Sequence, residues 1–254
     1  MAKTVDDGRM PLLEHLGELR DRLVKVAVAI AIGAMIAWFL YPQIFDVLLE
    51  PYCDLQGASV DDCRLLQTEP LEGFSVRLKV AGYGGIALAM PVILWQIWRF
   101  ITPGLHSHEK KYAIPFVLSA LLLFIMGAAL AYYTLPRALD FLVNIGGENL
   151  QTQFRPAPYF QLITYMMLAF GAGFEFPVIL VFLQLAGVVT AKNLRSVRRY
   201  AIVGIVVLVA VLTPSGDPYS LGILSIPMIF FYETSILIGS LLTRKRRKAE
   251  APSS

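Results

Sequence analysis

The chain has 254 residues, of which 56% are hydrophobic and only 16% are charged. This composition is too apolar for a soluble globular protein of that length, so it indicates a membrane protein. The net charge of +3 says little by itself, because it averages a basic face with an acidic one.

The basic residues are unevenly placed around six apolar stretches. The predicted spans are 23–41, 80–98, 112–135, 160–185, 200–213 and 219–241. Seven hydrophilic pieces lie between and beside them. The odd-numbered pieces, with Lys25 at the edge of the first span counted in the N-terminal piece, hold 17 of the 22 Lys and Arg residues. Because Lys and Arg beside spans stay on the cytoplasmic side, the sequence predicts an all-α membrane protein with six transmembrane helices and both termini inside.

The N-terminal residues 11–22 are predicted to form an amphipathic helix that runs into the first span, because leucines recur there at helical spacing. The polar face of this helix carries Glu18, for which two interpretations stay open. In the first interpretation, Glu18 pairs with Arg22, four residues on, as part of a solvated face. Alternatively, it contributes to an acidic spot at the membrane surface. The pattern alone favours the first interpretation.

Cys53 and Cys63 are the only cysteines, and both fall in the first outer loop. That compartment permits a disulfide, and closing so short a loop stabilises the fold by about 3 kcal/mol. The sequence therefore predicts one structural disulfide, with two free thiols as the alternative. The cysteine spacing suits no metal site, so no metal is expected.

The loop between the second and third predicted spans carries Glu109. As an acid in the first turn of the next helix, Glu109 suits the helix dipole and needs no further role. Just upstream, an aromatic belt at the membrane interface is indicated by Trp95, Trp98 and Phe100.

Two acids fall inside predicted spans. Glu175 lies in the fourth span, beside Pro177 and two glycines that loosen the helix. A carboxylate there is costly unless it is protonated, paired or wetted, so Glu175 is a functional-site hypothesis. Glu233 lies nearer the cytoplasmic end of the sixth span, where its side chain can reach the interface.

The fifth predicted span is short. Residues 200–212 make about 20 Å of helix at 1.5 Å per residue, against a hydrocarbon core about 30 Å thick. The two prolines and the glycine of 213–218 then force a turn. This span must therefore stop short or thin the bilayer locally.

The sequence gives no sign of an enzyme. It has no Gly-rich phosphate loop, no histidine in a span, and no serine or cysteine nucleophile paired with a base inside the membrane. Two non-enzymatic functions are among the alternatives that stay open. A proton-coupled secondary transporter would use Glu175, and a structural scaffold would tolerate the loss of both Glu18 and Glu109.

Four segments, taken in order, resemble the TatC family, the membrane receptor of the twin-arginine protein translocase. They are HLGELRDRL at 15–23, PVILWQIWRFITPGLHSHEKK at 91–111, FGAGFEFPVILVFL at 170–183 and LTPSGDPY at 212–219. The resemblance implies a glove-like, concave six-helix bundle with two short final helices. It would form one domain over 1–243, followed by a basic cytoplasmic tail, 244–254, in the bacterial cytoplasmic membrane.

The resemblance also implies roles for individual residues, and no cofactor. Positions that match the family's signal-peptide surface are Glu18, Glu109, Arg20, Phe100 and Leu105. The two acids among them suit paired arginines, because carboxylates bind guanidinium groups bidentately and prefer Arg to Lys. Positions expected to face the membrane groove or single-span partners of the TatA and TatB type are Glu175, Thr213 and Glu233. Folded proteins would be exported at the expense of the proton motive force.

Overall fold

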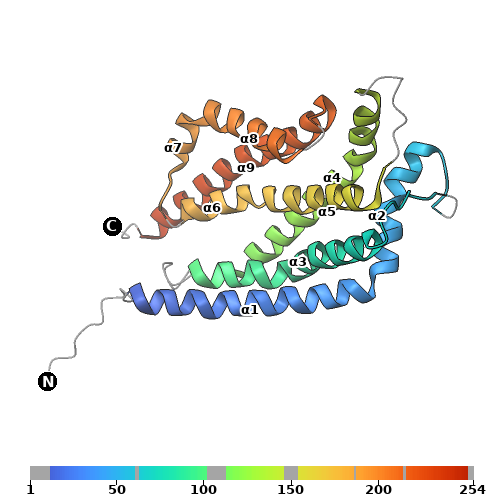
Figure 1. The fold of residues 1–254 in the computed structure, drawn as a ribbon. Coiled ribbons are helices and arrows are strands. Elements are labelled where there is room, and N and C mark those ends of the chain that lie inside the picture. Colours follow the sequence, from blue (N-terminus) through green and yellow to red (C-terminus); the bar gives the residue numbers. More distant parts are fainter. Residues whose placement is uncertain are drawn as a thin grey trace.

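The structure, a computed structural model, describes residues 12–60, 63–101, 113–145, 154–185, 187–213 and 216–250 (Figure 1). Every regular element in these ranges is an α-helix. In chain order the helices are α1 (Leu12–Phe39), α2 (Tyr41–Gln56), α3 (Glu72–Ile101), α4 (Ala113–Ile145), α5 (Pro156–Gly173), α6 (Phe176–Leu185), α7 (Ala191–Ser196), α8 (Arg198–Leu212) and α9 (Pro218–Glu250).

Five segments of the described chain are helical, long and apolar enough to cross a membrane. They are Gly17–Phe39, Glu72–Phe100, Ile114–Ile145, Pro156–Leu185 and Pro218–Leu241. The predicted all-α membrane fold is thus confirmed. The remaining predicted span corresponds to α8, which has only 15 residues. Six crossings therefore stay a prediction, and the shortness of α8 is the feature that the sequence anticipated.

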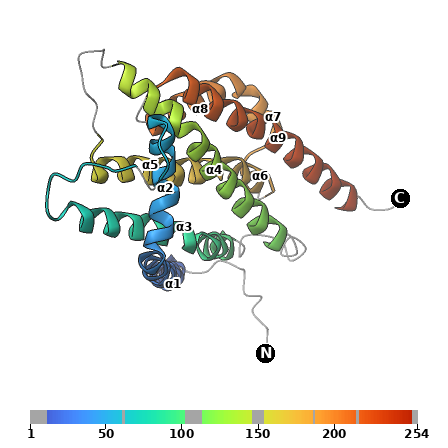
Figure 2. The same ribbon diagram turned by 90° about the vertical axis from the view of Figure 1, so that its right-hand side faces the viewer.

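The helices are arranged around α5 and α6. In both views the α1–α3 pair lies on one side of them and the α8–α9 pair on the other (Figure 1, Figure 2). The beginning of α1, the beginning of α4 and the end of α9 lie at the same end of the molecule in Figure 1. That common end is the one that the distribution of basic residues assigns to the cytoplasm.

The prediction of two short final helices is correct for α8 and wrong for α9. Helix α9 has 33 residues and continues through the basic segment that the sequence analysis set apart as a tail. The physical reason is that Lys, Arg, Ala and Glu are good helix formers, and cations are favourable near a helix C-terminus. Residues 244–250 thus extend the last span as helix.

The second span also begins earlier than predicted. Helix α3 starts at Glu72, so it includes Arg77 and Lys79, which the sequence analysis had placed in the outer loop. Both cations find partners within the fold. The guanidinium of Arg77 lies 4.5 Å from the ring centre of Trp38, and the ammonium of Lys79 donates a hydrogen bond to Gln161. Such contacts let charged residues continue an apolar helix.

Small residues bring α1 and α3 close together. A Cβ atom added at Gly85 of α3 would lie 2.6 Å from the backbone nitrogen of Ala34, and one added at Gly33 would lie 2.6 Å from the carbonyl oxygen of Gly85. Because those neighbours are backbone atoms, they cannot move aside as a flexible side chain could. Close helix packing of this kind is how membrane helices gain van der Waals contact.

Replacing Gly85 by Leu is therefore expected to destabilise the protein by about 1–3 kcal/mol, through overpacking at the α1–α3 contact. Thermal unfolding of the detergent-purified protein would measure the loss. Gly82→Leu is the matched control, because a Cβ at Gly82 meets nothing within 4 Å. Equal destabilisation by both variants would contradict the importance of this contact.

A disulfide joins the segment after α2 to that helix. Cys53 and Cys63 are bonded, with their Cα atoms 5.6 Å apart, and both side chains are buried. Tyr52 packs beside this pair against Tyr159 at the start of α5, with ring centres 5.6 Å apart. The Tyr159 hydroxyl in turn donates to the carbonyl of Leu48 at 2.7 Å. The disulfide thus lies in the packed region between α2 and α5, which we call the α2–α5 cap.

Replacing both cysteines by Ser is expected to lower the free energy of unfolding by about 3 kcal/mol, because the unfolded chain regains the loop entropy. Activity should fall less than stability, since no predicted binding residue lies in this cap. Alkylation followed by mass spectrometry checks the premise. Two thiols that react fully without reductant would refute the disulfide.

Candidate functional site

The first candidate site lies where the beginning of α1 meets the end of α3. Arg22 of α1 joins the two helices. Its Nη2 donates to the carboxylate of Glu18, one turn earlier, and its Nη1 donates to the backbone carbonyl of Gln96 in α3 at 3.2 Å. The same guanidinium lies 5.9 Å from the ring centre of Phe100. We refer to Glu18, Arg22 and Phe100 as the α1–α3 cluster.

The α1–α3 cluster is partly shielded from solvent. The Arg22 side chain is 11% exposed and that of Glu18 is 27% exposed. Partial burial makes an ion pair matter more than it does on an open surface, because solvent screens it less. The pairing of Glu18 with Arg22 is the one that the helical spacing suggested. The contact of Arg22 with α3 could not be read from that spacing.

The predicted peptide-binding residues divide into three groups. Glu18 and Phe100 are brought together, with Arg22 between them. Arg20 instead pairs with its neighbour Asp21 at 3.0 Å, and its side chain is 79% exposed. Two positions separate Arg20 from Arg22 on the helix, so the two side chains leave α1 in different directions. Glu109 and Leu105 lie outside the described residues.

An aromatic cluster fixes the two helix ends that flank the segment carrying Glu109. Trp98 near the end of α3 packs against Phe116 near the start of α4, with ring centres 4.5 Å apart. It also contacts Phe182 of α6 at 5.8 Å. Trp98 is buried, so its predicted place in an interfacial belt is wrong. Packing against α4 and α6 removes this indole from the membrane surface.

The second candidate site is the helix break at Glu175. Helix α5 ends at Gly173 and α6 begins at Phe176, so the acid sits in the interruption of one apolar segment. The sequence predicted such loosening from the glycines and Pro177. The Glu175 side chain is only 8% exposed, and its Oε1 atom has no hydrogen-bond partner among the described residues. A buried polar atom without a partner calls for an explanation.

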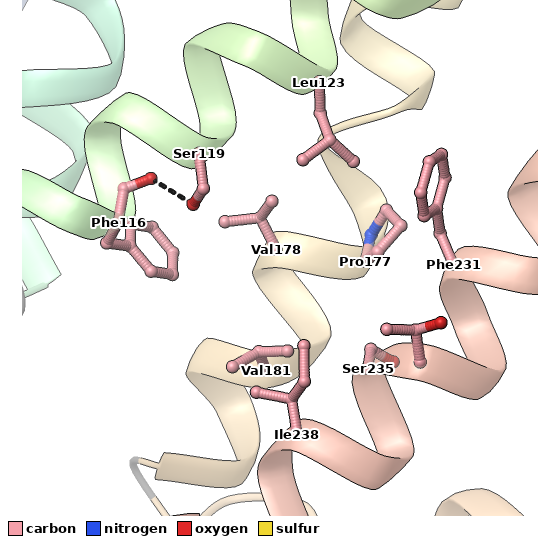
Figure 3. Close-up of a pocket in the computed structure, with 10 residues that line it drawn as sticks. Phe116, Ser119, Leu123, Pro177, Val178, Val181, Phe231, Ser235 and Ile238 are labelled. Atoms are coloured by element: carbon pink, nitrogen blue, oxygen red, sulfur yellow. Dashed lines mark hydrogen bonds between the residues drawn. The ribbon is translucent and has the colours of Figure 1, made fainter.

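A cavity of about 280 Å³ opens beside α6, between α4 and α9 (Figure 3). It is lined mainly by apolar side chains, including Leu123, Val181 and Ile238. Its hydroxyl groups are turned back onto their own helices. Ser119 donates to the carbonyl of Phe116 at 2.8 Å, and the other two hydroxyls likewise bond backbone oxygens. The cavity therefore suits an apolar group.

The other two residues predicted to face the groove or a partner are engaged within the chain. Thr213 is buried, and its hydroxyl donates to the carbonyl of Val209 at 2.7 Å, which closes the end of α8. Glu233 of α9 accepts a hydrogen bond from Arg198 at the start of α8, at 2.5 Å. No hydrogen bond or ion pair joins either residue to Glu175. The three residues are therefore not one site in this structure.

The described residues contain no group of three or more His, Cys, Asp and Glu side chains placed to hold a metal ion. What they offer instead is a carboxylate that binds a guanidinium, a buried acid at a helix break, and an apolar cavity. These groups suit recognition of peptides and helices.

Comparison with known proteins decides the family. The family described as "Sec-independent protein translocase protein (TatC)" matches residues 14–227. This chain belongs to the TatC family. The TatC protein of Frankia casuarinae is 41% identical to it, over 96% of this chain and 69% of the relative. The TatC protein of Aquifex aeolicus is 40% identical, over 95% and 99%.

The fold agrees with solved TatC structures. A crystal structure described as the twin arginine translocase receptor TatC in DDM matches with a TM-score of 0.74 at 38% identity, over 89% of this chain and 99% of that one. A second TatC crystal structure matches with a TM-score of 0.73. The sequence resemblance to TatC is thus confirmed. TatC proteins are components of a protein translocase, which makes this chain a transport protein of a multi-pass membrane type.

Proposed function

We propose that this chain is the receptor subunit of a twin-arginine translocase in a bacterial cytoplasmic membrane. It binds twin-arginine signal peptides at the cytoplasmic face through Glu18 and Glu109. With single-span partners of the TatA and TatB type, it exports folded proteins using the proton motive force. The observation that supports the binding role most is the α1–α3 cluster, in which Glu18 already holds a guanidinium group.

The α1–α3 cluster suggests how a peptide arginine is received. An incoming guanidinium either shares the Glu18 carboxylate with Arg22 or displaces Arg22 from it. Arg22 keeps two other contacts, with the Gln96 carbonyl and the Phe100 ring, so displacement from Glu18 does not leave it without partners. The face of Phe100 also attracts a cation. Glu109 would supply the second carboxylate for the second arginine.

Binding of signal peptides to the purified protein tests this proposal. A twin-Arg peptide should bind clearly more tightly than the same peptide with twin Lys, because the planar guanidinium matches a carboxylate bidentately and the ammonium does not. Equal affinity for both peptides would contradict recognition by the two acids.

Glu175 supports a second candidate, proton-coupled secondary transport, because its buried Oε1 lacks a partner among the described residues. A membrane-embedded acid of this kind is typical of proton relays. Uptake of a small molecule by vesicles that contain the purified protein alone would favour this candidate. Membership in a protein-translocase family makes it the weaker of the two.

The orientation proposed here places residues 1–22, 99–111, 186–199 and 242–254 in the cytoplasm, where basic residues are retained. A single cysteine introduced beside Lys192, in a variant lacking the two native cysteines, should react with a membrane-impermeant thiol reagent only after the cells are opened. Labelling of this cysteine in intact cells would show that the orientation is the opposite of the one proposed.

A further inference from the structure

Helix α3 carries a cation inside its membrane-spanning segment. Lys79 lies seven residues after the start of the apolar segment Glu72–Phe100, about 10 Å along the helix. Its Nζ donates to Oε1 of Gln161 in α5 at 2.8 Å. An ammonium group has three N–H donors, and Lys79 forms no ion pair with any described residue. A charged residue at this depth with only a neutral amide for a partner is a candidate binding group.

Lys79 lines a cleft with a second cation. The cleft measures about 480 Å³ and lies between α3 and the first turns of α5, with Arg155, Leu162 and Tyr165 among its walls. The guanidinium of Arg155 binds Glu69 at 2.8 Å and Glu72 at 3.4 Å. The hydrogen bond to Glu69 and the charge of Glu72 raise the pKa of Arg155, so it stays protonated.

The charges around the cleft sum to zero, but the Lys79 ammonium has no acidic partner among the described residues. Glu69 and Glu72 both bind Arg155, and the Glu72 carboxylate also accepts hydrogen bonds from the backbone N–H groups of Thr68 and Ala157, at 3.1 and 3.3 Å. Both acids are therefore already engaged with groups other than Lys79. A ligand with a negative charge and several acceptor oxygens would pair with the Lys79 ammonium, and a phosphodiester has both properties.

The surroundings of the cleft indicate that the phosphodiester belongs to a lipid. Phe74 and Leu78 in the first turns of α3, and Leu71 just before this helix, are exposed. In a membrane these side chains face acyl chains, which is where the tails of a bound phospholipid would lie. The Lys79 ammonium can form a charge-assisted hydrogen bond with the phosphate of a lipid headgroup. We propose that the Lys79–Arg155 cleft binds the phosphate headgroup of an anionic membrane phospholipid.

Native mass spectrometry of the full-length protein in detergent tests this proposal, with phosphatidylglycerol as the probe. Lys79→Met should weaken binding of the first phosphatidylglycerol about tenfold, whereas Lys79→Arg should retain it. Lys192→Met is the matched control, because it removes a lysine from α7 rather than from the cleft, and it should bind as the wild type does. Phosphatidylcholine, which has the same phosphodiester but no net charge, should bind more weakly than phosphatidylglycerol.

A second variant distinguishes a loss of lipid binding from a loss of the folded structure. Gln161→Glu would give Lys79 an ion-pair partner within the chain, so it should preserve the fold and weaken phosphatidylglycerol binding as much as Lys79→Met. Wild-type affinity in both variants would overturn the proposal, as would equal binding of phosphatidylcholine. Displacement of the lipid by an equal concentration of inorganic phosphate would also overturn it, because the site would then recognise phosphate without lipid. None of these readouts depends on signal-peptide binding.

Discussion

Glu109→Gln is expected to weaken binding of a twin-Arg signal peptide at least about tenfold, which corresponds to 1.4 kcal/mol. The substitution keeps the size of the side chain but removes the charge that a guanidinium pairs with, so a charge-assisted contact becomes a neutral hydrogen bond of roughly half the strength. Truncating a partly buried charge pair costs about 2–5 kcal/mol, against less than about 1 for an exposed pair. Peptide titration monitored by fluorescence anisotropy would measure the change.

Glu18→Gln should have a comparable effect, with one difference that the structure explains. Glu18 binds Arg22 in the absence of peptide, so the variant also loosens a contact at the base of α1. Measuring thermal stability beside affinity separates the two consequences. Arg22→Gln provides a further comparison, because it frees the Glu18 carboxylate from its resident guanidinium.

Asp21→Asn is the matched control for both acids. Asp21 lies on the same helix as Glu18, but it pairs with the exposed Arg20 rather than with the α1–α3 cluster. If the two acids recognise arginines directly, Asp21→Asn should change affinity little, and a twin-Lys peptide should be affected much less than a twin-Arg peptide by Glu109→Gln. Equal losses for the three variants would mean that the acids act only through general surface charge.

Glu175→Ala is expected to reduce export of a folded reporter protein about tenfold or more, while signal-peptide binding survives. The physical reason is that a buried carboxyl oxygen, Oε1, without a partner among the described residues is retained at a cost, which a contact with a partner helix or a proton would offset. Copurification of TatA- and TatB-type partners would show whether assembly is the step that fails.

Glu233→Ala serves as the comparison for Glu175. Its carboxylate is already bound to Arg198 within the chain, so its removal should affect partner assembly less than the loss of Glu175 does. Loss of peptide binding by Glu175→Ala, with partner assembly intact, would show that this acid belongs to peptide recognition instead.

The sequence predicted those features that depend on local pattern. Leucine spacing predicted the helix that continues into the first span. Pro177 with its neighbouring glycines predicted a loosened helix beside Glu175, where the structure has a break between α5 and α6. The two cysteines predicted the bond that the structure contains. The short α8 followed from the length of its apolar run before the turn.

The features that the sequence did not predict depend on contacts between distant segments. Charge alone placed Lys79 in a loop, because its partner Gln161 lies in another helix, 82 positions later. The role of Arg22 in joining α1 to α3 likewise requires a carbonyl 74 positions away. The contact of Glu233, predicted to face the groove or a partner, with Arg198 also joins two different helices. Hydrophobic periodicity carries no information on such pairs.

Site-specific cross-linking in native membranes tests the central claim most directly. A photoreactive amino acid would replace Phe100, which lies in the α1–α3 cluster. Membranes with this variant would be incubated with a precursor protein that carries a twin-arginine signal peptide and then irradiated. We expect a cross-link to the signal peptide that is lost when its two arginines are replaced by lysines. We also expect no such cross-link from Val203, an exposed residue of α8. Cross-linking at Phe100 that is equally strong with the twin-lysine precursor, or absent with both, would contradict the assignment of this cluster as the signal-peptide site.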